Sequence, residues 1–482
     1  MPPLVRTEGK IVTAARLGVG RGASLGVELL TTAILMRMLG PEAFGLVAMA
    51  MSVIIAFAVL AESGIGMSLV SDRTFSKERI SAALMLALVL GLVLAAVALA
   101  LTPAIVYFYQ DSRVAAPWMA ACVLVVLSSV ASVPMSLAQR AERFALIAGV
   151  PLLISVASGA LAIGLAYVYA TFWPLVIRHA AARALTFAAY WWALQPQLGR
   201  PARADFVEVL RFSRGVVGFG LLNCVNRNID KILIGRFLGV HELGLYVFAY
   251  NVLAVPLGEL GRLAQTIAYP KLSRYAPNWQ RVGAALGSGV ADITSFVTPF
   301  CLGLAVTAPD VIPVVFGPVW TDAVVPFRVL ALLAIYQIPF ACLGLAYTVS
   351  RRTDSMMTWA LFATPPTVLS FIIGLKWGIA GVTVAYAITS LLLAVPMVRY
   401  AARTLGIRPA VLASPALGGL FRGAIAAVPL LVLYAGACLL DVSPLVRIAA
   451  AVSGGLIGEA ALLARSIRHQ PSGDAVLAWE RT

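Results

Sequence analysis

Charged residues are scarce in this sequence. Only 12% of its 482 residues are Asp, Glu, Lys or Arg, about half the share that is usual in a soluble domain. With 61% hydrophobic residues and a mean hydropathy of +0.93, the chain has too few polar side chains to cover a surface in water. This shortage excludes a water-soluble globular protein and indicates an integral membrane protein.

The sequence also lacks motifs for metal binding and catalysis. Its five cysteines are widely spaced in apolar segments, with no CxxC pair, and predict neither a disulfide framework nor a metal site. The three histidines are too scattered for a catalytic network, and no P-loop is present for ATP. Without a long loop for a periplasmic catalytic domain, a membrane polymerase or ligase is also disfavoured. We expect no enzyme and no cofactor, with H⁺ or Na⁺ coupling left open.

Acidic residues are fewer than basic ones, which gives a net charge of +15. In a protein of many membrane spans, such an excess is typical of cytoplasmic loops and of contact with lipid headgroups. Nucleic acid is therefore not an expected partner. The first 16 residues are polar and basic, and do not predict a cleavable signal peptide.

Long apolar runs are what the sequence has instead. The run at 80–101 is continuous and long enough to cross a bilayer as a helix, whereas a membrane barrel would alternate apolar and polar residues. We predict an all-α integral membrane fold with about fourteen transmembrane helices. The expected spans are 17–36, 43–62, 80–102, 115–137, 145–168, 172–193, 213–235, 243–266, 283–307, 324–348, 356–375, 379–398, 420–440 and 444–464.

Basic residues alternate between the predicted loops. They gather in every second loop, as at Arg73, Lys77 and Arg79, and in both terminal segments. Positive charge stays on the side of the membrane that is not translocated. The pattern predicts an even number of spans, with both termini in the cytoplasm. A bacterial cytoplasmic (inner) membrane is the location implied by the family resemblance described below.

One loop motif occurs twice. Residues 37–46 read RMLGPEAFGL and residues 236–245 read RFLGVHELGL, each before an apolar run. Further matching segments precede the fourth and tenth spans. We predict two parallel six-helix repeats, 1–200 and 201–408, followed by an extra helix pair and cytoplasmic tail at 409–482. Transporters built from such repeats bind substrate between the halves.

The motif itself favours a structural role. Gly40 and Gly239 are suited to cap the preceding helix, and Pro41 prevents that helix from continuing. Gly45 and Gly244 are expected to open the next helix at a tight turn. A role as an outer gate, where the two copies meet, is the alternative.

The order of these motifs resembles a known family. The doubled R-x-L-G-x-x-x-x-G-L, the D-K-x-x-I-G-R at 230–236 and the F-G-x-x-W at 316–320 resemble the Wzx-type polysaccharide flippases, in the branch of the colanic acid exporter. That family belongs to the multidrug/oligosaccharidyl-lipid/polysaccharide exporter superfamily, so the resemblance implies a MATE-like fold.

The resemblance also implies a function. The chain would move undecaprenyl-pyrophosphate-linked oligosaccharide repeat units across the membrane by alternating access, for exopolysaccharide, capsule or O-antigen. A polysaccharide polymerase and chain-length machinery would be possible partners. The alternative is an ion-coupled small-molecule or multidrug exporter of the same superfamily.

Charges inside predicted spans are costly and mark candidate sites. The seventh span places Asn223, Arg227, Asp230 and Lys231 at helical spacings that share one face. Its excess positive charge suits the phosphates of a lipid-linked sugar, because arginine binds phosphate well. Ion pairing with another helix, or snorkelling to headgroups, remains the alternative. The candidates for substrate binding are Arg227, Lys231, Asn223, Arg21 and Arg178.

Carboxylates inside spans are candidates for ion coupling, because in a low dielectric they can titrate near neutral pH. Glu28, Asp230 and Asp292 are the three candidates. The sequence does not choose among them.

Overall fold

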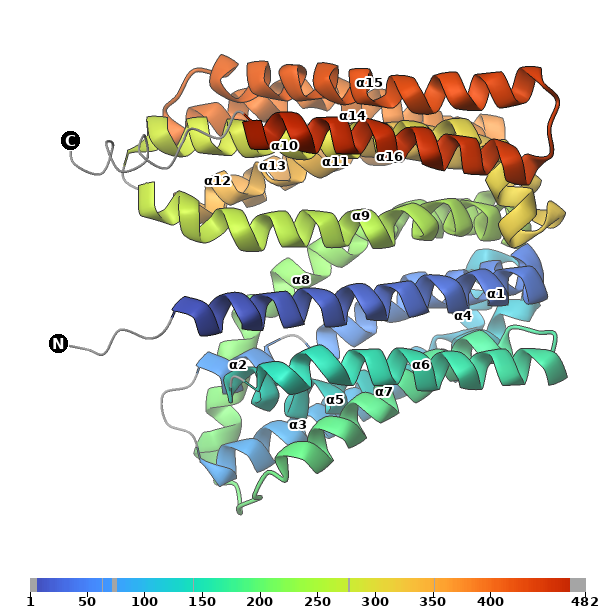
Figure 1. The fold of residues 1–482 in the computed structure, drawn as a ribbon. Helices are drawn as coiled ribbons and strands as arrows, with labels where there is room; N and C mark the ends of the chain where they lie inside the picture. The colour runs from blue at the N-terminus through green and yellow to red at the C-terminus, as the bar shows by residue number, and fades with distance from the viewer. Residues whose placement is uncertain are drawn as a thin grey trace. The chain divides into compact units, whose positions relative to one another are not determined.

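The computed structural model describes residues 7–62, 64–71, 76–141, 143–275, 278–350 and 352–468 (Figure 1). Side chains are described for these residues except 7–19, 21, 67, 71, 144, 211–223, 225–226, 254–257, 259–271, 353 and 465–468. Every regular element in this part is helical, which confirms the predicted all-α fold. The longer helices are α1 (Thr7–Glu62), α3 (Lys77–Ala100), α5 (Ala115–Arg140), α6 (Phe144–Val168), α7 (Trp173–Leu194), α8 (Arg203–Phe237), α9 (Val240–Tyr275), α10 (Trp279–Val311), α11 (Val324–Ala341), α13 (Thr353–Gly374), α14 (Gly378–Leu405), α15 (Ala410–Leu439) and α16 (Pro444–Arg468).

Short helices connect several of these elements. They are α2 (Ile65–Ser71), α4 (Thr102–Tyr109), η1 (Ser112–Val114), η2 (Ile312–Phe316), η3 (Pro318–Ala323), α12 (Gly344–Val349) and η4 (Leu375–Trp377). The same local order follows α3 and α10: a short helical segment, a 3₁₀ turn, and then a long helix. This matches the similarity that the sequence shows before the fourth and tenth spans.

Helix α1 is broken at Gly40. Its φ of 72° and ψ of 177° lie outside the helical region, so two arms meet there. Glycine tolerates this conformation, and Pro41 is suited to begin the second arm. The two arms carry the predicted spans 17–36 and 43–62.

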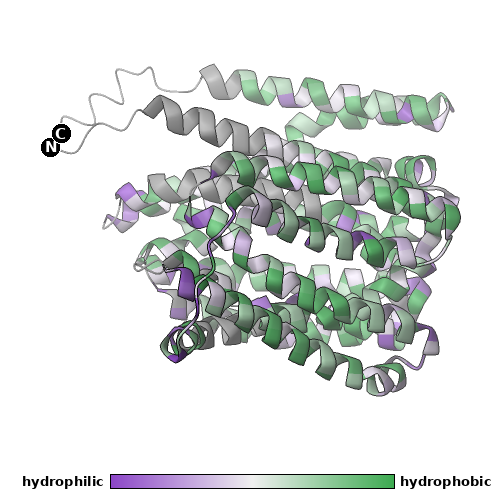
Figure 2. Cartoon of the chain, turned by 90° about the horizontal axis from the view of Figure 1, so that it is seen from below, coloured by the Kyte–Doolittle hydropathy of each residue, from purple (hydrophilic) through white to green (hydrophobic). Residues whose placement is uncertain are grey.

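Most of the longer helices have the length and composition of membrane spans. Each predicted span falls on a helix or on one arm of α1, except 324–348, which covers α11 and α12. Within the described residues, nine helical segments are long and apolar enough to cross a membrane, and α7, α8 and α9 are not among them. Figure 2 shows apolar residues along the helices, with hydrophilic residues mainly near helix ends and turns. The chain is therefore a multi-pass membrane protein, and the number of crossings stays a prediction.

The chain folds into two compact units, Met1–Phe248 and Ala249–Thr482. This division follows packing and does not follow the predicted repeat. Helix α8 belongs to the second repeat by sequence, yet it packs against α1 and α3 in the first unit. The repeat boundaries at 200 and 408 remain predictions.

Helix α5 is central to the first unit, where it packs against α1, α3 and α7. The fully buried Trp118 donates a hydrogen bond from Nε1 to the carbonyl oxygen of Ala98, at 2.9 Å. The Ser129 hydroxyl lies 3.1 Å from the carbonyl oxygen of Ala61 and 2.7 Å from that of Ala87. These polar contacts link α5 to α1 and α3 inside an apolar core.

The two copies of the repeated motif meet in the first unit. A Cβ atom on Gly45 would lie 1.9 Å from the carbonyl oxygen of Val240. A Cβ atom on Gly244 would lie 2.0 Å from the carbonyl oxygen of Pro41. Only glycine allows backbones to approach this closely, so the second glycine of each copy serves a contact between the copies.

Small residues join the C-terminal helix pair to α10 in the second unit. A Cβ atom on Gly419 of α15 would lie 2.3 Å from the carbonyl oxygen of Ala291 on α10. One on Gly458 of α16 would lie 1.9 Å from the carbonyl oxygen of Ala426 on α15. Close backbone approach at small residues is a recurrent way of packing helices in membranes. We call this set of contacts the glycine seam.

Candidate functional site

The charged candidates of the first unit lie on α1, α7 and α8. Arg178 of α7 is half-buried and donates a hydrogen bond from Nη1 to Thr32 Oγ1 on the first arm of α1, at 3.2 Å. Its guanidinium is within electrostatic range of Glu28, one helical turn before Thr32. The structure thus brings together a predicted substrate-binding residue and a predicted ion-coupling residue.

A second arginine on α7 has its own carboxylate. Arg183 is within electrostatic range of Glu62, at the end of the second arm of α1, and Glu62 also lies near Ser128 of α5. Two positions five residues apart on a helix differ by about 140° in direction around its axis. Arg178 and Arg183 therefore point to different arms of α1. Sequence reasoning missed Glu62, because an acidic residue at the end of an apolar run looks like an ordinary helix boundary.

Asp230 of α8 is almost fully buried, at 5% exposure. It accepts a hydrogen bond of 2.6 Å at Oδ2 from the hydroxyl of Tyr246 on α9. Its Oδ1 atom is buried without a hydrogen-bond partner among the described atoms. A buried carboxylate with one oxygen unsatisfied is costly, which makes Asp230 a notable polar feature of α8.

The remaining candidates on α8 have different surroundings. Lys231 is half-buried and donates to Asn228 Oδ1 at 3.3 Å, whereas the side chain of Arg227 is exposed. The helical spacing in the sequence predicts that Asp230 and Arg227 share one face of the helix. The structure instead buries Asp230 against Tyr246, so the two residues share less of a surface than the spacing suggests. The side chains of Asn223 and Arg21 lie outside the described residues.

Asp292 belongs to the second unit and is exposed on α10. Its Oδ1 lies 3.6 Å from Arg422 Nη2 on α15, an ion pair that sequence reasoning did not anticipate. Both side chains are more than half exposed. This pair links the candidate to the C-terminal helix pair, and the coupling role of Asp292 remains a prediction.

A second polar cluster in this unit was also missed. Asp310 of α10 is buried, accepts a hydrogen bond of 2.6 Å from the Tyr434 hydroxyl of α15, and lies 3.7 Å from Arg447 of α16. Arg447 also pairs with Asp441, at 2.9 Å. The cluster joins the same three helices as the glycine seam. Its signal in the sequence was weak, since the partners are more than a hundred residues apart.

Charges also gather in the first unit near the repeated motif. Arg113 pairs with Asp111 at 2.9 Å and with Glu42, a motif residue, at 3.1 Å. The hydrogen bond from the Arg113 side chain lowers the pKa of Asp111 below its ordinary value. These side chains are mostly exposed, so the pair stabilises the fold only weakly.

The described residues hold no group of three or more His, Cys, Asp or Glu side chains that could bind a metal ion. The chemical groups that the first unit presents to a ligand are the charged side chains of α1, α7 and α8. Four cations and three carboxylates have been described above on α1, α7 and α8, and cations in a low dielectric attract an anion. The cations are Arg178, Arg183, Arg227 and Lys231, and the carboxylates are Glu28, Glu62 and Asp230.

Comparison with known proteins identifies a family. A family model described as "Polysaccharide biosynthesis protein" matches residues 34–325. The chain is 30% identical over 178 residues to the teichuronic acid biosynthesis protein TuaB of Bacillus subtilis, covering 35% of this chain and 36% of TuaB. It is 23% identical over 237 residues to the lipopolysaccharide biosynthesis protein WzxC of Escherichia coli, covering 47% of each chain.

A third relative aligns over more of the chain. The succinoglycan biosynthesis transport protein ExoT of Rhizobium meliloti is 24% identical over 328 residues, which are 66% of this chain and 64% of ExoT. The alignments therefore span from about one third to just under two thirds of the curated relatives.

Solved structures show the same fold. The lipid II flippase MurJ, in an inward closed conformation, matches with a TM-score of 0.71 and 14% identity, over 95% of this chain and 100% of MurJ. An inward-facing multidrug resistance transporter of the MATE family matches with a TM-score of 0.61 and 16% identity, over 79% and 94% of the two chains. These matches confirm the predicted MATE-like architecture.

Proposed function

Because the chain belongs to the family of polysaccharide biosynthesis proteins, we propose that it is a flippase for lipid-linked oligosaccharides. It moves undecaprenyl-pyrophosphate-linked repeat units from the cytoplasmic to the periplasmic leaflet of a bacterial inner membrane, by alternating access. The names of TuaB, WzxC and ExoT, from three cell-surface polysaccharide pathways, support a role in exopolysaccharide, capsule or O-antigen synthesis. The basic loops support cytoplasmic termini.

The excess of cations on α7 and α8 carries this proposal. A pyrophosphate-linked substrate presents a strongly negative group at the membrane, and arginine binds phosphate through paired hydrogen bonds. The exposed Arg227 is the candidate for direct phosphate contact. Arg178, which donates to Thr32 and is within electrostatic range of Glu28, is a second candidate for phosphate contact. Lys231, Arg21 and Asn223 complete the proposed binding set.

Transport fits this chain better than catalysis does. The family and its structural neighbours are transport proteins, and the predicted loops are too short for a catalytic domain. Energy from an ion gradient would require a titratable site, for which Glu28, Asp230 and Asp292 are the candidates. A polysaccharide polymerase is a possible partner, as the acceptor of the translocated unit.

Reconstitution tests the proposal. Purified protein in vesicles should translocate a labelled undecaprenyl-pyrophosphate oligosaccharide, and Arg227→Gln should reduce the rate about tenfold, as expected for one lost charge-assisted hydrogen bond. Arg113→Gln is the matched control, since Arg113 already pairs with Asp111 and Glu42. Wild-type rates in Arg227→Gln would remove that residue from the site.

The same vesicles distinguish the alternative function. Translocation of cationic drugs, with no movement of the oligosaccharide, would identify a multidrug exporter and overturn the proposal. A gradient of H⁺ or Na⁺ imposed across the vesicles tests coupling. An Asp230→Asn variant that no longer responds to the gradient would assign coupling to that carboxylate.

A further inference from the structure

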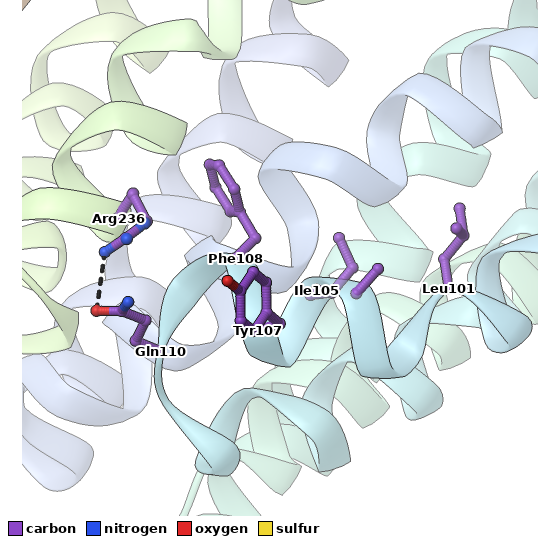
Figure 3. Close-up of a pocket in the computed structure, with 7 residues that line it drawn as sticks. Leu101, Ile105, Tyr107, Phe108, Gln110 and Arg236 are labelled. Carbon is purple, nitrogen blue, oxygen red and sulfur yellow. Dashed lines mark hydrogen bonds between the residues drawn. The ribbon is translucent and has the colours of Figure 1, made fainter.

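A pocket of about 510 Å³ lies in the first unit where α4 meets the end of α8 (Figure 3). Leu101 and the residues of α4 supply an aliphatic and aromatic lining, which includes Ile105 and Phe108. Gln110 and Arg236 supply the polar part. The pocket is thus amphiphilic, with an apolar side along a helix and a cation at one end.

Arg236 is the charged residue of this pocket. It donates a hydrogen bond from Nη1 to the amide oxygen of Gln110, at 3.2 Å, and its guanidinium lies 5.4 Å from the ring centre of Phe237. Neither neighbour neutralises it, and in the part of the chain that the structure describes no carboxylate forms an ion pair with it. Its remaining donors are therefore suited to an anion.

Gln110 has an unusual backbone. It ends α4 with φ 56° and ψ 29°, the left-handed conformation that helix ends normally assign to glycine. A side chain at such a position costs conformational energy and persists where the surroundings need it. Here the side chain accepts a hydrogen bond from Arg236, an interaction that glycine could not make.

The position of α4 between two candidate spans leads us to expect the pocket near the lipid headgroups. Helix α4 follows one candidate span, Lys77–Ala100, and precedes another, Ser112–Arg140, so it lies at the end of both. Tyr107 is 83% exposed, as expected for an aromatic residue in the membrane interface. At such a depth, hydrocarbon would be available to the apolar lining and phosphate to Arg236.

We propose that this pocket binds one anionic phospholipid, with its phosphodiester on Arg236 and the start of an acyl chain along α4. One guanidinium matches the single negative charge of a phosphodiester. A pyrophosphate bearing several sugars would need more polar donors than the Gln110 amide and the Tyr107 hydroxyl provide. The bound lipid would tie α4 to the end of α8, and its presence does not depend on which substrate the protein carries.

Native mass spectrometry tests the site. Protein is exchanged into nanodiscs of phosphatidylethanolamine and phosphatidylglycerol, released, and examined for retained phosphatidylglycerol. The wild type should retain one such lipid, and Arg236→Gln should retain it about tenfold less, as expected for one lost charge-assisted hydrogen bond. Arg113→Gln, an arginine already paired with two carboxylates, should retain it as the wild type does. Equal retention by Arg236→Gln and the wild type would overturn the proposal.

A second variant guards against misfolding of Arg236→Gln. Gln110→Gly removes the amide that orients Arg236 and also relieves the left-handed backbone. We expect lower lipid retention with an unchanged or raised melting temperature. Wild-type retention in Gln110→Gly would contradict the proposed geometry. Displacement of phosphatidylglycerol by an equal amount of undecaprenyl pyrophosphate would assign the pocket to the substrate and overturn the choice of phospholipid.

Discussion

Gly45 and Gly244 stand at the same position of two copies of one motif, and each packs against the backbone of the other copy. Gly45 meets Val240, and Gly244 meets Pro41, so the fifth residue of each motif receives the ninth residue of the other. The contact therefore has an approximate two-fold symmetry. The motif marks a duplication and also forms a joint between the duplicated segments.

Substitution at this joint should destabilise the protein. In Gly45→Ala or Gly244→Ala, a methyl group would lie within about 2 Å of a carbonyl oxygen, so the backbones must separate. We expect a loss of about 1–3 kcal/mol, the usual cost of overpacking, seen as a lower melting temperature in detergent. Gly149→Ala on α6, with open space around its Cβ, is the control. Equal melting temperatures for the three variants would contradict the close contact.

The hydrogen bond between Tyr246 and Asp230 gives a second prediction. Tyr246→Phe would remove the hydrogen bond to Asp230 Oδ2. Because Oδ1 of this buried carboxylate already lacks a partner, neither oxygen would then accept a hydrogen bond from a tyrosine. The expected loss of stability is about 1–3 kcal/mol. Tyr167→Phe, which removes the hydroxyl of a tyrosine that is 80% exposed, should change little. Thermal unfolding of the two variants measures the difference. A melting temperature of Tyr246→Phe equal to that of the wild type would show that the fold does not depend on this hydrogen bond.

Two adjacent glycines test the glycine seam. Gly419 packs on the backbone of Ala291, whereas Gly418 has no neighbour within 4 Å of its Cβ position. Gly419→Ala should destabilise the protein by about 1–3 kcal/mol, and Gly418→Ala should be neutral or stabilising by up to about 1 kcal/mol. Melting temperatures of the two variants, measured under identical conditions, test this difference. The reverse order would place the seam on the wrong face of α15.

Asp111 predicts a dependence on pH. The Arg113 side chain lowers the pKa of Asp111, so the folded form favours the ionised carboxylate. Its stabilisation is present at neutral pH and is lost as the pH falls below the ordinary aspartate pKa of about 3.9 towards the lowered value. The melting temperature of the wild type should exceed that of Asp111→Asn by a small, constant amount above about pH 5 and approach it in acid. A difference that grows in acid would reverse the sign and reject the pairing.

Much of the helical framework was predictable from the sequence. Apolar runs of spanning length placed the predicted spans on helical segments, because such runs have few alternatives in a bilayer. The span 324–348 is the exception in detail, since α11 and α12 divide it. Gly40 and Pro41 also predicted a helix boundary, since glycine permits and proline enforces a break. The structure adds that α8 packs with the first unit, which the repeat alone did not indicate.

The candidate site was less predictable, because the partners of charged residues are distant in the sequence. Arg178 and Glu28 were both singled out, yet only the packing of α7 on α1 shows them as neighbours. Asp230 was expected beside Arg227, but its burial depends on Tyr246 from the next helix. Glu62 and Asp310 escaped notice because spacing along one helix does not reveal a contact on another.

The glycine seam has a mechanical consequence for α15 and α16. Backbones in direct contact cannot slide past each other without first separating, and the cluster of Asp310, Tyr434 and Arg447 fastens the same three helices. We therefore expect helices α10, α15 and α16 to move together as one rigid body during the proposed transport cycle. A spectroscopic label on α16 would then report the displacement of α10, a helix that is harder to label because so much of its surface is covered.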